Sequence, residues 1–167
     1  MLKLTPLSFV TYLFAFLFSC VTQASPFNSE AQQALLIDLT TGTILYEKDA
    51  DKLVAPSSMS EIMTVYMVLN EIKQGRLSLQ DTFSVSTKAW KMRGSRMFIR
   101  VKSDVTVSDL LRGVIVQSGN DAAIALAEGV AGSEEAFVEM MNKKAREIGA
   151  RDAHFTNATG WPDPDHQ

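Results

Sequence analysis

Two short stretches of the sequence carry side chains that nucleophilic chemistry requires. The first spans residues 55–64, where Ser58 follows Pro56 and precedes a run of apolar residues with helical spacing. Because proline is excluded from helix interiors and serine is a favoured N-cap residue, this stretch predicts a loop that enters a helix. A serine at that point could cap the helix. It could also act as a nucleophile whose oxyanion is stabilised by backbone N–H groups and the positive helix end.

Glu61 lies three residues after Ser58, so we expect it one turn along the helix and on the same face. Its reference pKa is about 4.3, which makes it ionised at neutral pH but a weak base toward an alcohol. Burial would raise that pKa and restore some basicity. Serine followed three residues later by glutamate is also the pattern of a helix capping box, and Ser57 with Ser60 forms a rival cap.

The second stretch is Ser118-Gly119-Asn120, which lies between two apolar segments. Glycine and asparagine tolerate left-handed backbone geometry, so the tripeptide predicts a turn. Taken alone, it is also the sequence of an ordinary turn. Between two buried helices, however, such a turn would hold the side chains of Ser118 and Asn120 at a fixed point in a cleft.

The elements that must position these residues follow from periodicity and turn residues. Two β-rich runs at 34–39 and 43–48 flank a Thr-Gly turn and predict an antiparallel hairpin. A short β-like run follows at 82–86. Helical spacing with plausible caps predicts four helices, at residues 62–74, 109–116, 122–128 and 134–148. We place the N-caps of the second and fourth helices at Ser108 and Ser133. The pattern predicts an α+β fold that is mostly helical after its first hairpin.

Residues 1–24 have the composition of a secretory signal peptide, with Lys3 as the only charge, an apolar run, and a small-residue site at Ala24. The apolar run is short of the roughly 20 residues that a spanning helix needs. Cys20 is the only cysteine, so residues 25–167 would contain no disulfide, and lipidation at Cys20 stays open. A net charge of −3 gives no evident attraction to nucleic acid. No ligand spacing of His or Cys indicates a metal, and no cofactor is expected.

The stretch around Ser58 and, above all, residues 110–128 resemble the serine-type D-alanyl-D-alanine carboxypeptidases, the low-molecular-weight penicillin-binding proteins. The family's first motif is S-x-x-K, and Ser58 falls on its nucleophile while Glu61 falls on its lysine. Ser118-Gly119-Asn120 matches the second motif, S-x-N, in full. The third motif, a Lys-Thr-Gly on a sheet strand, is absent from the sequence. The resemblance covers about residues 31–167.

This resemblance implies a partial β-lactamase/transpeptidase-like fold in residues 25–167, truncated because the remaining sheet strands are missing. It implies a periplasmic hydrolase that removes the terminal D-Ala from peptidoglycan stem pentapeptides through an acyl-enzyme on Ser58. Ser118 would relay a proton, and Asn120 would hold the substrate amide. β-Lactams would bind if Ser58 is reactive. The loop at 154–166 resembles a family segment that folds back toward the active site.

The carboxylate of Glu61 and the missing third motif imply that activity is impaired or absent. We interpret the change from lysine to glutamate as a drift from a catalytic pair to a helix cap, which would add about 1 kcal/mol of helix stability. The alternative function is a non-catalytic periplasmic protein that binds muropeptide or a protein partner. Peripheral membrane association and oligomeric state stay open.

Overall fold

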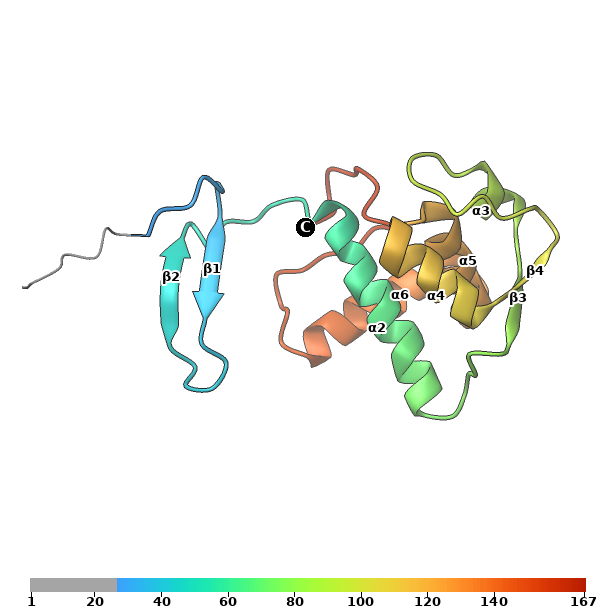
Figure 1. The fold of residues 1–167 in the computed structure, drawn as a ribbon, viewed down its shortest axis with the longest axis horizontal. Coiled ribbons are helices and arrows are strands. Elements are labelled where there is room, and N and C mark those ends of the chain that lie inside the picture. The colour runs from blue at the N-terminus through green and yellow to red at the C-terminus, as the bar shows by residue number, and fades with distance from the viewer. Residues whose placement is uncertain (1–26) are drawn as a thin grey trace, which may run out of the picture. The chain divides into compact units, whose positions relative to one another are not determined.

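A computed structural model describes residues 27–167 (Figure 1). The predicted signal peptide and Cys20 lie outside the described residues. The chain divides into two compact units, one ending at Lys52 and the other spanning Leu53–Gln167. Within residues 27–167, none of the helices combines the length and the apolar character that crossing a membrane would demand.

The first unit contains the predicted antiparallel hairpin, formed by β1 (Ala34–Ile37) and β2 (Ile44–Lys48). Ala34 pairs with Lys48, and the register shifts by a bulge near the end of β1. In the turn, the carboxylate of Asp38 accepts hydrogen bonds from the Thr40 amide and the Thr41 hydroxyl. The hairpin prediction is therefore confirmed, and a local polar network closes its turn.

The second unit is mostly helical, with one small antiparallel sheet. Its helical elements are η1 (Ser57–Met59), α2 (Ser60–Lys73), α3 (Thr87–Lys91), α4 (Val107–Gln117), α5 (Asn120–Ala131) and α6 (Glu134–Glu147). Its strands are β3 (Thr82–Ser84) and β4 (Asp104–Thr106), with Thr82 opposite Thr106. The described chain thus has the expected α+β composition.

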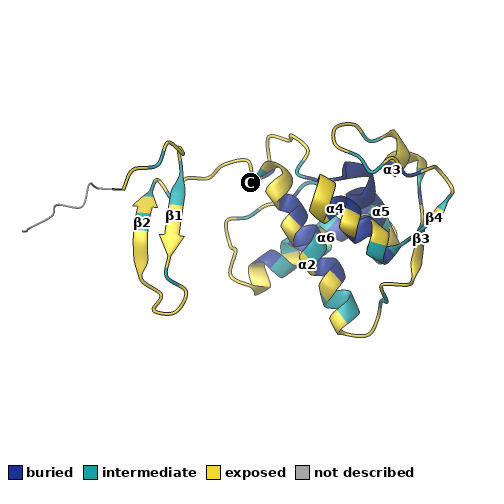
Figure 2. Cartoon of the chain, viewed as in Figure 1, coloured by how far each residue is buried: buried dark blue, intermediate teal, exposed yellow. Residues whose placement is uncertain are grey.

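Helix α5 forms the centre of this unit (Figure 2), and each of its residues from 120 to 127 is buried. It packs against α2, α3, α4 and α6. Its many alanines explain this position, because small side chains let neighbouring helices approach closely without leaving voids. Around α5 lie two clusters of buried apolar side chains, one containing Leu110, Val114 and Ile124 and the other containing Phe137 and Met141. Met141 is thus fully buried in the core.

The predicted helix ends are partly wrong. Ser133 caps α6 as expected, because its side chain accepts a hydrogen bond from the Ala136 amide. The cap of α4, however, is Thr106 and not Ser108, since the Thr106 hydroxyl accepts from the amide of Asp109. Thr106 also ends β4, so one residue closes the strand and opens the helix.

Candidate active site

Ser58 lies in the single 3₁₀ turn that leads into α2, and this turn replaces the predicted capping box. Neither η1 nor α2 has a side-chain cap, so the interpretation of Ser58 and Glu61 as a cap is wrong, as is the rival cap by Ser57. The reason is that backbone carbonyls satisfy the first amides: the amide of Met59 donates to Pro56 and that of Ser60 donates to Ser57. The hydroxyl of Ser58 is thereby left for other contacts.

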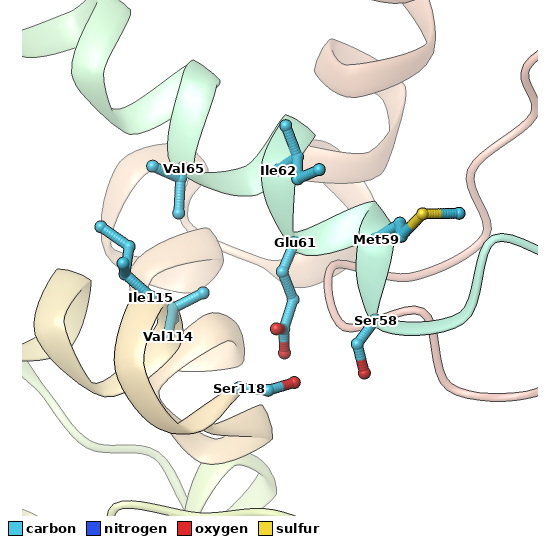
Figure 3. A pocket seen from close by; sticks show the side chains of 8 residues that line it. All are labelled: Ser58, Met59, Glu61, Ile62, Val65, Val114, Ile115 and Ser118. Atoms are coloured by element: carbon cyan, nitrogen blue, oxygen red, sulfur yellow. The ribbon is translucent and has the colours of Figure 1, made fainter. Parts of the chain in front are cut away.

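The Glu61 side chain extends to the same side of the helix as Ser58 and toward the hydroxyl of Ser118 (Figure 3). Glu61 is only 6% exposed, and its buried Oε1 atom has no hydrogen-bond partner. Burial raises the pKa of the Glu61 carboxyl, and the nearby Ser118 hydroxyl acts in the opposite direction. A carboxyl group therefore lies one turn along the helix from Ser58, in surroundings that disfavour its charge.

Ser118 ends α4 in a left-handed conformation, with φ 52° and ψ 48°. Its amide donates to the carbonyl of Val114, and the amide of Gly119 donates to Gly113. This is the predicted turn between two buried helices. Left-handed geometry costs a residue other than glycine about 1–2 kcal/mol, and such strain is often found where a side chain serves a site.

Asn120 is the first residue of α5, and it forms hydrogen bonds with the loop at residues 93–95. Its Nδ2 donates to the carbonyl of Arg93 at 2.8 Å, and its backbone amide donates to the carbonyl of Ser95 at 2.9 Å. Gly94 makes this approach feasible, because a Cβ there would lie 2.7 Å from Asn120 Nδ2. One N–H of the Asn120 side chain is thus already used, which leaves the rest of the amide for a ligand.

Two pockets bring the four predicted residues together. The larger, of about 480 Å³, has three polar residues on its wall, Ser58, Glu61 and Ser118. Its other lining residues are apolar: Met59, Ile62, Val65, Val114 and Ile115. A second pocket of about 280 Å³ shares Ser58 and Ser118 and adds Asn120 and Trp161. Both serines therefore face two adjoining spaces, and the second is lined by more polar residues than the first.

Two residues of the apolar wall, Ile62 and Ile115, fit the helical spacing of core residues, yet they are 70% and 65% exposed. The buried residues of α2 include the apolar Met63, Met67 and Val68 and also the polar Ser60, Glu61 and Thr64. The inward side of α2 thus combines part of its apolar face with polar residues, and Ser60 and Thr64 make polar contacts there.

Those polar contacts come from the C-terminal loop, which folds back toward the site as expected. Thr64 Oγ1 donates to the carbonyl of Ala158 at 2.7 Å, and Ser60 Oγ lies 2.7 Å from His166 Nε2. His166 is 3% exposed, and its burial lowers the pKa of the imidazole. Sequence reasoning considered His166 only as a metal ligand and missed its structural role. No cluster of three or more potential ligand side chains was found in residues 27–167.

Asp121 is the other residue that sequence reasoning missed. It is 1% exposed, and its two carboxylate oxygens accept from the backbone amides of Met97 (2.9 Å) and Ile99 (3.2 Å). A charged residue at the start of an otherwise apolar helix was the available signal, because a buried carboxylate requires donors. Asp121 fixes the 97–99 segment next to Asn120.

A family model described as D-alanyl-D-alanine carboxypeptidase, peptidase S11, matches residues 20–167. The chain belongs to this family. The D-alanyl-D-alanine carboxypeptidase DacF of Bacillus subtilis is 39% identical over 144 residues, which are 86% of this chain and 37% of that protein. The solved structure of DacD from Francisella tularensis matches with a TM-score of 0.82 and 39% identity, over 85% of this chain and 34% of that one.

Penicillin binding protein 5 from Haemophilus influenzae matches with a TM-score of 0.81 and 38% identity, over 86% of this chain and 42% of that one. This chain of the D-alanyl-D-alanine carboxypeptidase family thus spans less than half the length of each of these three relatives. The resemblance inferred from the motifs and the partial transpeptidase-like fold are confirmed.

Proposed function

We propose that this chain is a D-Ala-D-Ala carboxypeptidase-like protein that binds the end of peptidoglycan stem peptides beside Ser58 and acylates slowly or not at all. In this proposal Ser58 is the nucleophile, Ser118 relays the proton, and Asn120 holds the substrate amide. The protein acts in the periplasm after removal of residues 1–24. The observation that carries the proposal is the buried Glu61 carboxyl, which faces Ser118 where the family motif has lysine.

The chemistry of Glu61 explains why acylation of Ser58 is slow in this proposal. To attack a carbonyl, Ser58 must lose its proton to a neighbouring base. The ionised carboxylate is a weak base toward an alcohol, because its reference pKa of about 4.3 is far below that of an alcohol, and the upward shift caused by burial offsets this only in part. Loss of a well-placed general base costs about 100-fold to 10,000-fold in rate. A carboxylate in the cleft also repels a substrate that ends in a carboxylate.

Labelling with a fluorescent penicillin tests the proposal. We expect the protein to be labelled at least about 100-fold more slowly than a family member with an intact S-x-x-K motif. Any residual label should disappear in Ser58→Ala and persist in Ser57→Ala, a matched control from the same turn. Glu61→Lys should not restore a normal rate if the third motif is also required. Labelling of the unaltered protein at the rate of its relatives would refute the proposal.

A second candidate function is non-covalent binding of muropeptide. It is favoured by the smaller pocket, where Asn120 and Trp161 lie beside both serines and where binding would not need the chemistry of Glu61. Titration of a D-Ala-D-Ala pentapeptide into Ser58→Ala, followed by Trp fluorescence, separates the two functions. Unchanged pentapeptide binding in this variant, together with no penicillin labelling of the unaltered protein, supports the second candidate, whereas slow labelling at Ser58 supports the first.

A further inference from the structure

We propose that the 480 Å³ pocket binds a small organic ammonium ion, that is, a protonated amine attached to an apolar chain. This activity goes beyond the proposed function, because it requires no reaction at Ser58. Three features carry the inference: a buried acceptor without a partner, three oxygen-bearing side chains at one end of the pocket, and an apolar wall beside them.

The first feature is the Glu61 carboxyl. Oε1 is buried and has no hydrogen-bond partner among the described residues. Glu61 as a whole is only 6% exposed, so water outside the protein has little access to it. Leaving a buried charged acceptor without a donor costs several times the net free energy of an ordinary hydrogen bond. Such atoms therefore normally have a partner. Figure 3 shows this carboxyl directed into the pocket, where a ligand could supply the missing donor.

The second feature is the number of acceptors. The hydroxyls of Ser58 and Ser118 face the same space as Glu61, which gives three oxygen-bearing side chains at one end of the pocket. A primary ammonium has three N–H donors and no acceptor, so its requirements match this set. A carboxylate or phosphate ligand would instead place negative charge against Glu61.

The third feature is the apolar wall formed by Ile62, Val65, Val114 and Ile115. It would cover the hydrocarbon part of the ligand, and 480 Å³ lies within the usual range for small-molecule sites. The low polarity near Glu61 strengthens the attraction between the two charges. Because Glu61 lies in the first turn of α2, the positive helix end favours its ionised form when the cation is bound.

The pH dependence of binding follows from the same geometry. Among the described residues that line the pocket, Glu61 is the only acid or base, and α4 contributes no charged side chain to the wall. Burial raises the pKa of Glu61 in the free protein. A bound cation stabilises the ionised carboxylate, so affinity should rise with pH as Glu61 loses its proton and then become constant.

Calorimetric titration with n-hexylammonium chloride tests the proposal. We expect a dissociation constant of about 1 mM, which is typical of a ligand of this size. Hexan-1-ol has the same apolar chain without the charge and should bind at least about tenfold more weakly. Glu61→Gln keeps the shape of the side chain and should also weaken hexylammonium binding about tenfold or more. Equal affinity for the alcohol, or unchanged affinity in Glu61→Gln, overturns the proposal.

Glu128→Gln is the matched control. Glu128 also has a buried carboxyl oxygen without a partner, but it lies on α5 and does not line this pocket. Its replacement should leave hexylammonium binding unchanged. The carboxyl ¹³C resonance of Glu61 in the unaltered protein gives a second readout, and it should shift on titration with hexylammonium. Hexylammonium binding and penicillin labelling are measured separately on the unaltered protein, so failure of either proposal is visible by itself.

Discussion

Substitution of Gly160 by alanine is the sharpest test of how the site is held together. Gly160 has φ +75°, and a Cβ atom there would lie 1.7 Å from the carbonyl oxygen of Ser57. No heavy atom tolerates that separation, so the C-terminal loop must move away from the turn that carries Ser58. Gly132 provides a matched control, because it also has positive φ (+84°) but no atom within 4 Å of the same added group.

The expected magnitude follows from the contacts that would be lost. Positive φ alone should make Gly132→Ala less stable by about 1–2 kcal/mol. Gly160→Ala bears the same strain and also separates the loop from α2, which breaks the hydrogen bonds of Thr64 with Ala158 and of Ser60 with His166. With about 1 kcal/mol for each bond, we expect a total loss of about 3–4 kcal/mol.

Urea unfolding followed by circular dichroism at the helix band measures both variants. Gly160→Ala should have the lower midpoint by a margin well outside the error of extrapolation. If the two alanine variants lose the same free energy of unfolding, the close contact between Gly160 and Ser57 is wrong. The C-terminal loop would then not support the turn that carries Ser58.

Three further predictions concern buried titratable groups. Asp121→Ala should lower the free energy of unfolding by about 3 kcal/mol, because two buried backbone amides lose a charged acceptor; a loss below about 1 kcal/mol in urea unfolding would contradict this. Because the folded pKa of His166 is lowered, its stabilising contribution should be complete above pH 6.5 and decline as pH falls through that folded pKa. His166→Ala should remove this decline from the stability–pH profile. The folded pKa of Glu61 is raised, so stability should fall as pH rises above 4.5. Glu61→Gln should then be more stable by about 1 kcal/mol at pH 7 and equal near pH 4, as measured by thermal unfolding.

Local signals in the sequence were sufficient for most of the secondary structure. The hairpin follows from β-branched runs around a Thr-Gly turn, and α6 follows from the Ser133 cap and its apolar face. The turn at Ser118-Gly119-Asn120 was also predicted, although its left-handed residue is Ser118 and not Gly119 or Asn120. In each case the deciding interactions lie within a few residues along the chain.

The site itself depended on contacts that no local pattern contains. The capping box failed because backbone carbonyls already satisfy the first amides of α2. The burial of Ser60 and Thr64 on α2 was not predicted, because both side chains bond to residues about a hundred positions away. Periodicity reports hydrophobicity along one helix, and it cannot report a polar partner supplied by a distant loop.

The contact between Ser60 and His166 joins groups 106 positions apart in the chain. Ribosomes synthesise α2 long before they reach the histidine, so the beginning of that helix must wait for its partner while the other helices form from nearby residues. Closure of long loops is slow compared with local helix formation. We therefore expect the cleft around Ser58 to mature last during biosynthesis, and a nascent polypeptide released before the histidine would possess helices without a finished cleft.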